Sequence, residues 1–207
     1  MIVSEYKKFS NYKSIIGVDE AGRGPIAGPV VAAAVILPNS FVIPQLDDSK
    51  KLSTKIREEL YELIKERSID YSIFSMDHTI IDEINILQAT FRAMNNAINN
   101  LNHPGDFILV DGSYLPSKAP DIELKLPAKP IIKGDEKYHC IAAASILAKV
   151  YRDNLMKNYA LKYRGYGFES NKGYPTIKHK NTLKKLGPCA IHRKSYKPVR
   201  EIIENNN

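Results

Sequence analysis

The feature that most constrains this chain is a pair of adjacent acids set between two β-branched runs. Residues 15–18 have the composition of a β-strand and lead directly into Asp19 and Glu20; a glycine-rich stretch at residues 21–29 then precedes a second strand-like run at residues 30–37. Glycine and proline between two such runs predict strand, tight loop and strand. The two carboxylates then lie at a strand end, where they can offer hard oxygen ligands to Mg²⁺ or Mn²⁺.

The glycine-rich stretch is unlike two familiar phosphate-binding motifs. It lacks the Gly-Lys-Ser/Thr ending of a Walker loop, and it leads into a strand, whereas the glycines of a dinucleotide fingerprint open a helix. Its glycines leave backbone N–H groups that a phosphate or a sugar can approach. The plainer alternative for the acidic pair is a solvated loop or a helix N-cap.

Two further acids occupy related places downstream. Residues 107–110 predict a short apolar strand that ends in Asp111, and acids at the ends of separate strands can converge on one metal site. Asp135 stands just ahead of an alanine-rich helix predicted over residues 141–150. It is either a partner of the helix N-terminus or a fourth metal ligand, and the sequence leaves both interpretations open.

The segments between these acids predict the scaffold. Ser53 or Thr54 can cap a helix that runs to Ile64, residues 71–75 predict a strand, and helical spacing of apolar residues spans residues 80–101. The proline-rich segment after Asp111 predicts short edge strands around residues 122–126. The alternation of strands and helices through about residue 150 indicates an α/β layer fold.

Charge is distributed unevenly along the chain. Residues 149–200 hold 14 Lys/Arg against Asp153 and Glu169, whereas the whole chain carries a net charge of +7, so the remainder is net acidic. This asymmetry favours catalytic carboxylates beside a surface that holds a polyanion; a basic solvated surface without a ligand is the alternative. Among the aromatic residues interleaved with these charges, Tyr174 lies in a turn-like segment and is expected to be presented for stacking.

The length of 207 residues suits one domain, in which residues 160–207 form a basic helical cap. No apolar stretch reaches membrane-spanning length, and the N-terminal residues do not resemble a signal peptide. Cys140 and Cys189 are isolated, without metal-type spacing, and Cys140 is expected to be a buried free thiol. We therefore expect a cytoplasmic monomer with no membrane partner.

With these residues in view, the chain closely resembles the bacterial ribonuclease HII (type 2 ribonuclease H) family over nearly its whole length. The resemblance rests on ordered motifs at residues 17–25 (GVDEAGRGP), 47–53 (DDSKKLS), 109–112 (LVDG), 133–135 (KGD), 142–150 (AAASILAKV), 171–176 (NKGYPT), 186–188 (LGP) and 191–196 (IHRKSY). Several ordered motifs are far more specific than any one of them.

The resemblance implies an α/β ribonuclease H-like fold: a five-stranded mixed sheet flanked by helices, with a basic helical C-terminal extension. It also implies an endoribonuclease that hydrolyses the RNA strand of RNA–DNA hybrids and cuts duplex DNA on the 5′ side of single embedded ribonucleotides, leaving 3′-hydroxyl and 5′-phosphate ends. Two divalent cations, Mn²⁺ or Mg²⁺, would act in hydrolysis. Asp19, Glu20, Asp111 and Asp135 take the positions of the four metal-site carboxylates.

Selectivity would come from sensing a 2′-hydroxyl, the group that distinguishes RNA from DNA. Gly22, Arg23 and Gly24 resemble the family's sensing loop, and Tyr174 matches a tyrosine that stacks against the sugar after the ribonucleotide. Four basic residues are candidate phosphate contacts, for each of which a solvated surface cation is the alternative: Lys50, Lys149, Arg152 and Lys172.

One departure from the family pattern is an apparent enlargement of the loop at residues 113–129. Two rival classes remain at this level. A nucleic-acid-binding module without catalysis would explain the basic half but has no use for converging acids. A metal-dependent DNA exonuclease or phosphatase would use the acids but would not need the glycine loop and Tyr174.

Overall fold

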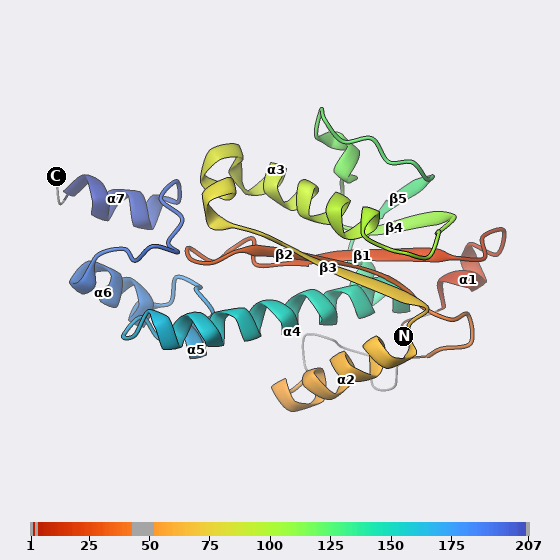
Figure 1. Ribbon diagram of the computed structural model, residues 1–207, viewed down its shortest axis with the longest axis horizontal. Helices are drawn as coiled ribbons and strands as arrows, with labels where there is room; N and C mark the ends of the chain where they lie inside the picture. Colours follow the sequence, from red (N-terminus) through yellow and green to blue (C-terminus); the bar gives the residue numbers. More distant parts are fainter. Residues whose placement is uncertain (1, 3, 43–51, 206–207) are drawn as a thin grey trace.

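The computed structural model describes residues 2, 4–42 and 52–205 of the chain. Its centre is a mixed sheet with the strand order β3-β2-β1-β4-β5 (Figure 1). Strands β1, β2 and β3 pair antiparallel, whereas β4 and β5 run parallel to β1. The α/β class and the five-stranded mixed sheet expected from the sequence are confirmed. The strands are β1 (Ile15–Ala21), β2 (Val30–Ile36), β3 (Asp70–Met76), β4 (Phe107–Asp111) and β5 (Ala128–Ile131).

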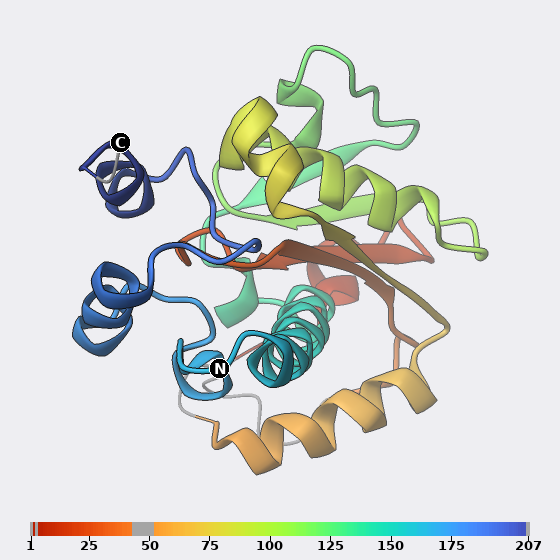
Figure 2. The ribbon, with the colours of Figure 1, turned by 60° about the vertical axis from the view of Figure 1, so that its left-hand side comes forward.

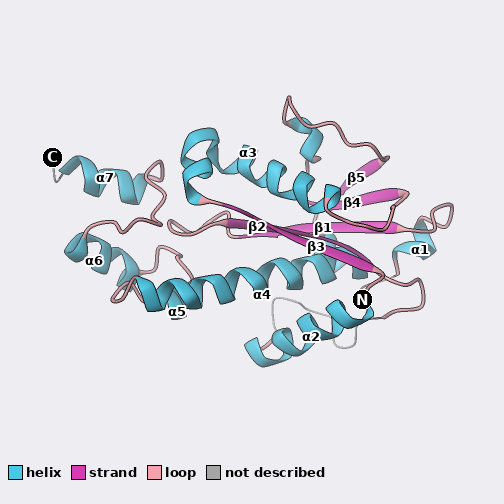
Figure 3. Cartoon of the chain, in the orientation of Figure 1, coloured by secondary structure: helices cyan, strands magenta, loops and turns pink. Residues whose placement is uncertain are grey.

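Helices cover both faces of this sheet. Seen from the side, α3 lies on one face and α4 on the other, with α2 outside α4 (Figure 2). The short helices that follow α4 gather beyond one end of the sheet (Figure 3). The α-helices are α1 (Glu5–Lys8), α2 (Thr54–Arg67), α3 (His78–Asn99), α4 (His139–Lys162), α5 (Phe168–Asn171), α6 (Ile177–Leu186) and α7 (Lys197–Asn205), and the 3₁₀-helices are η2 (Pro116–Lys118) and η3 (Gly134–Glu136). None of the described helices is long and apolar enough to cross a bilayer.

Strand β2 is buried along its whole length, which explains its purely apolar sequence. Successive side chains of a strand point to opposite faces. Ala32, Ala34 and Ile36 accordingly pack in the cluster under α3, while Val31 and Val35 pack against α2 and α4. The sheet is therefore the middle layer of three.

Strand β1 and helix α4 approach each other so closely that only glycine fits at position 17. A Cβ atom added there would lie 2.2 Å from the carbonyl carbon of Cys140. The next residues of α4 on this side, Ala142 to Ala144, are small and fully buried. The helix backbone thus lies directly on β1 at the level where the strand reaches Asp19.

Two details of the helices follow from local capping. The side chain of Ser53 accepts a hydrogen bond from Ile56 N at 3.3 Å, so the predicted N-cap of α2 is confirmed. Helix α3 is interrupted at Asn85, which has a φ of 66° and whose side chain accepts hydrogen bonds from Leu87 N and Gln88 N. The regular helix expected over residues 80–101 therefore contains a second, internal cap.

The expectation of edge strands at residues 122–126 is wrong. The edge strand beside β4 is β5, and it holds Pro130, which the outer edge of a sheet tolerates. Ile122 packs instead with Phe91 of α3, and Leu124 and Leu126 pack on the cluster under the same helix. Burial against α3, a long-range contact, overrides the local strand pattern.

The C-terminal helices share a hydrophobic cluster with the glycine-rich loop. Ile26 and Ala27 of the loop pack with Met156 of α4 and with residues of the later elements, including Phe168 and Val199. Ile26 N also donates to Gly173 O, and Gly28 N to Ile191 O, both at 2.9 Å. The loop is therefore built into the C-terminal part of the protein.

The contact at Gly17 generates a prediction. Gly17→Ala should destabilise the protein by about 3 kcal/mol, because the new methyl group meets backbone atoms that cannot turn aside. For a chain of this size that corresponds to a fall in Tm of about 6–12 °C. The matched control is Gly24→Ala, whose added Cβ would find ordinary contact with the Tyr174 ring at 3.4 Å. Equal thermal stability of the two variants would contradict the steric argument.

Candidate active site

Asp19 and Asp111 lie at the ends of neighbouring parallel strands. The last paired positions of β1 and β4 are Val18 and Val110, so the two aspartates follow in register. Alternation along each strand places them on the face covered by α4, the face on which Ile15 and Leu109 pack. The structure thus brings together two acids that are 92 residues apart in the sequence.

Asp135 is brought to the same place by a hydrogen bond to the end of β4. The carboxylate oxygen Oδ1 of Asp111 accepts from Gly134 N at 2.6 Å, and this bond fixes η3 against the strand. Asp135 itself is 7% exposed. Asp135 precedes α4 and lines the cavity described below, and its role as a partner of the helix N-terminus or as a metal ligand stays a prediction.

Glu20 follows Asp19 within β1 and does not lie beyond the strand, because β1 continues to Ala21. Alternation directs the two side chains to opposite faces of the strand. Glu20 Oε1 forms an ion pair with Arg23 Nη1 at 3.2 Å, while Glu20 N donates to Asp19 Oδ1 at 2.7 Å. The acidic pair is therefore linked through its own backbone.

The ionised forms of Asp19 and Glu20 are electrostatically unfavourable in the folded protein without a bound cation. Burial raises the pKa of Asp19 well above its ordinary value, and the nearby charges of Glu20 and Asp111 raise it further; Ser145 partly offsets this with a hydrogen bond. Burial also raises the pKa of Glu20, against the opposing effect of Arg23. Buried acids that repel each other form a place where a cation would be stabilised.

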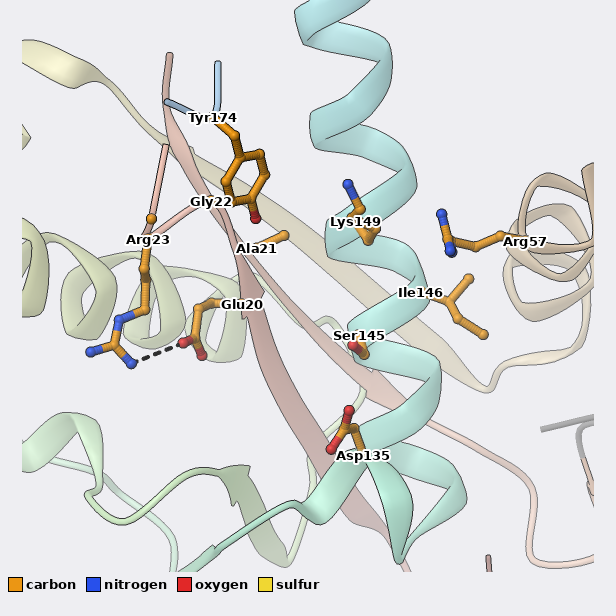
Figure 4. A pocket seen from close by; sticks show the side chains of 11 residues that line it. Glu20, Ala21, Gly22, Arg23, Arg57, Asp135, Ser145, Ile146, Lys149 and Tyr174 are labelled. Atoms are coloured by element: carbon orange, nitrogen blue, oxygen red, sulfur yellow. Dashed lines mark hydrogen bonds and ion pairs between the residues drawn. The ribbon is translucent and has the colours of Figure 1, made fainter. Parts of the chain in front are cut away.

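Glu20 and Asp135 line a cavity of about 450 Å³ (Figure 4), whereas Asp19 and Asp111 lie next to them in the chain or the sheet and are not part of its lining. Glu20 projects from β1, Asp135 lies below it beside the first turns of α4, α4 runs along one side, and Tyr174 lies at the upper end with the glycine-rich loop in this view. Arg57 of α2 reaches toward it from beyond α4. The lining consists of Glu20, Ala21, Gly22, Arg23, Gly24, Arg57, Asp135, Ser145, Ile146, Lys149 and Tyr174.

The chemistry of these groups fits a hard divalent cation, since all four candidate ligands are carboxylates. Their side chains do not yet form a metal-binding arrangement. In the described part of the chain, no group of three or more His, Cys, Asp or Glu side chains is arranged to hold a metal ion as it stands. The carboxylates are neighbours, and binding a metal would require their side chains to turn toward a common point.

The loop at residues 22–29 is held from behind by two buried arginines. Arg152 of α4 donates to Pro29 O at 2.9 Å, to Ala27 O at 3.2 Å and to Lys172 O at 3.0 Å. Its side chain also fills the space that a Cβ atom on Gly22 would need. Arg193, from the segment after α6, is fully buried and binds five loop carbonyls.

The expected phosphate contact at Arg152 is corrected by this arrangement. The residue is 1% exposed, and its guanidinium N–H groups donate to backbone carbonyls. Burial lowers the pKa of Arg152 to about 10, with a further contribution from the charge of Arg193. Arg152 therefore organises the loop and does not face a ligand.

Tyr174 is 42% exposed and projects over the loop, as expected. Its carbonyl oxygen is bonded to His179 Nδ1 at 2.8 Å, His179 Nε2 lies 3.2 Å from His192 Nε2, and Cys189 N donates to His192 Nδ1 at 3.0 Å. A backbone donor at one end and a backbone acceptor at the other fix both tautomers. His192 Nε2–H donates to His179 Nε2, and His179 Nδ1–H donates to Tyr174 O.

The other lysines predicted to contact phosphate lie in different places. Lys149 lines the cavity and pairs with Asp153 Oδ1 at 2.6 Å. Lys172 lines an adjoining groove of about 270 Å³ between α2 and α4, and its ammonium donates to Glu169 O. Lys50 lies outside the described residues. Arg57 lines both hollows and was not singled out by sequence reasoning.

Sequence reasoning also gave no individual roles to Ser145, His179, His192, Arg193 and Tyr196. The last three belong to the IHRKSY motif at residues 191–196, which carried part of the family resemblance. For Arg57 and Ser145 the sequence offers only a position on an expected helix. Their relation to the site depends on how α2 and α4 pack on the sheet.

Asp19→Asn should stabilise the protein near neutral pH. Because the folded-state pKa of Asp19 is raised, its contribution to stability is present below the ordinary value of 3.8 and is lost as the pH rises through the raised value. Asn keeps an oxygen for the Glu20 N–H group without the charge. We expect a higher Tm than wild type by a few degrees at pH 7–8, about 2–4 °C per kcal/mol, and a smaller gain at pH 4.

The control for this prediction is Glu66→Gln, at an exposed acid on α2. A difference in Tm between Asp19→Asn and wild type that is independent of pH would contradict the electrostatic explanation.

The histidine pair predicts acid sensitivity. Burial and the neighbouring His179 lower the pKa of His192 to about 4. In the unfolded chain this histidine binds a proton below about pH 6.5, whereas in the folded chain it stays neutral until about pH 4. The free energy of unfolding therefore decreases as the pH falls from 6.5 toward 4, by up to about 1.4 kcal/mol per pH unit for each proton. In urea unfolding across this range, His192→Gln should show a shallower pH slope than wild type. Equal slopes in His192→Gln, wild type and the exposed control His103→Gln would contradict it.

Comparison with known proteins agrees with the fold and with these motifs. The protein-family model described as Ribonuclease HII matches residues 16–199. A ribonuclease HII of Geotalea uraniireducens is 51% identical over 194 residues, which cover 94% of this chain and 87% of the relative. The crystal structure of the ribonuclease H2 from Pyrococcus horikoshii matches with a TM-score of 0.77 and 28% identity, over 93% of this chain and 98% of that chain.

A structure titled Bst-RNase HIII in complex with Mn²⁺ matches with a TM-score of 0.71 over 93% of this chain and 70% of that chain. At 16% identity this likeness concerns the fold alone. The matched family model spans most of the chain, including β1 with its acids, the glycine-rich loop, β4 and the IHRKSY motif. The chain belongs to the ribonuclease HII family, and this membership supports a ribonuclease H activity, that of a nuclease that hydrolyses phosphodiester bonds.

Proposed function

We propose that the protein is an endoribonuclease that hydrolyses the RNA strand of RNA–DNA hybrids and cuts duplex DNA on the 5′ side of a single embedded ribonucleotide. The observation that carries this proposal is a shared cavity. Carboxylates line one part of it, and the Gly22–Arg23–Gly24 loop with Tyr174 lines another. This arrangement supports the proposal, because phosphodiester chemistry and recognition of one sugar would then lie within reach of the same nucleotide.

Asp19, Glu20, Asp111 and Asp135 would hold the divalent cations, Mg²⁺ or Mn²⁺. Bound there, two such ions would activate water for in-line attack on phosphorus and stabilise the leaving 3′-oxygen, which gives 3′-hydroxyl and 5′-phosphate products. The raised pKa of Asp19 supports this assignment, because a cation would relieve the repulsion that burial intensifies. The fold shared with a Mn²⁺ complex is consistent with the donor set.

The chain's own residues would bind and orient the substrate. Lys149 and Arg57 lie on the helical side of the cavity, where their charges suit the phosphates next to the scissile bond. The ring of Tyr174 would stack on the sugar that follows the ribonucleotide. The glycine-rich loop would present backbone N–H groups to the 2′-hydroxyl, the group that distinguishes the two sugars.

The test compares a duplex DNA that carries one ribonucleotide with its all-DNA twin, each incubated with Mg²⁺ or Mn²⁺. Wild-type protein should cut the first duplex 5′ to the ribonucleotide and leave the second intact. Asp111→Asn should lower kcat by about a hundredfold or more with little change in duplex affinity, because it removes one charge from the group that is needed for chemistry.

Outcomes of this test separate the rival classes. Cutting of both duplexes would indicate a general nuclease that ignores the 2′-hydroxyl. Tight binding without cutting of either duplex would indicate a binding module. The matched control is Asp106→Asn, because Asp106 lies outside the cavity and accepts hydrogen bonds from Lys13 N and Ser14 N at the start of β1.

A further inference from the structure

The carbonyl groups of the loop at residues 22–29 turn inward to a buried cationic centre. Arg193 Nη2 donates to Gly22 O at 2.7 Å and Arg193 Nη1 to Arg23 O at 3.1 Å. Tyr196 Oη also donates to Arg23 O, at 2.8 Å, and accepts from Arg193 Nη1 at 3.0 Å. The carbonyl of Arg23 is thus held by two side chains from the same turn of the chain.

Fixing a carbonyl fixes the N–H group of the next residue. A peptide unit is planar, and in the trans form its C=O and N–H bonds point in opposite directions; the structure contains no cis peptide among its described residues. Holding Gly22 O therefore orients the N–H of Arg23, and holding Arg23 O orients the N–H of Gly24. Both N–H groups are directed away from Arg193.

Gly22, Arg23 and Gly24 all line the cavity, and because the two glycines have no side chain, their backbone borders it; we infer that the side away from the buried Arg193 is the cavity side. Within residues 4–42 and 52–205, neither Arg23 N nor Gly24 N is a donor in the hydrogen bonds that the loop forms. Gly22 has a φ of 99°, a conformation that L side chains rarely adopt, so the reversal of the chain at this point is built into its sequence.

We propose that Arg193 and Tyr196 are positioning residues for ribonucleotide selectivity: they hold the peptide planes of residues 22–24 so that the Arg23 and Gly24 N–H groups face the 2′-hydroxyl. This inference rests on the proposed function and adds a source for its selectivity. Arg193 is fully buried, so it would act without touching the substrate. Both act through the loop backbone, from the segment between α6 and α7.

Their chemistry suits this role. A guanidinium presents several N–H donors in one rigid plane, so a single Arg193 can bind carbonyls that approach from different parts of the loop. A lysine ammonium has three donors around one atom and cannot span the same set. The Tyr196 ring lies 5.1 Å from the guanidinium carbon of Arg193, which keeps its hydroxyl beside Arg23 O.

Tyr196→Phe is the sharpest variant, because it keeps the ring and removes the hydroxyl. Affinity is measured for the ribonucleotide-containing duplex and for its all-DNA twin, with Ca²⁺ as the only divalent cation and with both duplexes verified as uncut. We expect affinity for the ribonucleotide duplex to fall by roughly fivefold, the value of one neutral hydrogen bond, and affinity for the all-DNA duplex to stay unchanged.

The matched control is Tyr166→Phe. Tyr166 Oη also donates to a backbone carbonyl, that of Gly187 at 2.7 Å, in the same C-terminal part of the protein, but this acceptor is not part of the loop. This control should leave the affinity ratio of the two duplexes as in wild type. Arg193→Lys should reduce the ratio more than Tyr196→Phe, together with a fall in Tm; if it does not fold, Tyr196→Phe still decides the matter.

The outcomes separate this inference from the proposed function. If wild type prefers the ribonucleotide duplex and Tyr196→Phe either keeps that preference or weakens both duplexes equally, the positioning role is overturned while the proposed function stands. If wild type binds both duplexes equally and cuts neither or both, the proposed function fails, and the inference fails with it.

Discussion

The direct packing of α4 on β1 is the contact on which the site depends. Because position 17 has no side chain, the backbone at Cys140 can rest on the strand, and the rest of the helix follows at close range. Helix α4 then contributes side chains to three parts of the site. Near its start Ser145 reaches Asp19, in its middle Lys149 lines the cavity, and beyond that Arg152 holds the loop. Any shift of α4 would move all three together.

The site combines two opposite electrostatic arrangements. Around Asp19, buried carboxylates face one another, which leaves a demand for positive charge. Behind the loop, two buried arginines donate to backbone carbonyls, and within the part of the chain that the structure describes no carboxylate accepts a hydrogen bond from either guanidinium. The carbonyl dipoles there compensate for the lost hydration of the guanidinium groups. The first arrangement is suited to binding an ion, and the second fixes the shape of a loop.

The sequence predicted the parts of this structure that depend on short-range signals. The strands carrying Asp19 and Asp111 were identified from apolar runs followed by acids, and parallel pairing then brings strand ends together. Residues 122–126 were misassigned because their apolar side chains pack on α3, which a local pattern does not reveal. Arg152 was misinterpreted for a related reason: a basic residue among other basic residues suggests a surface, whereas its burial follows from carbonyls more than 120 residues earlier in the chain.

The bond between Arg193 and Gly22 joins positions 171 residues apart. A ribosome makes a protein from its N-terminus, so β1 and its acids exist long before the guanidinium that shapes the neighbouring loop. The carbonyls of residues 22–29 have no Arg193 to bind until the chain has been made as far as residue 193. During synthesis the acids are therefore present before the Arg193 contacts of the loop can form, and a segment made later completes one made earlier.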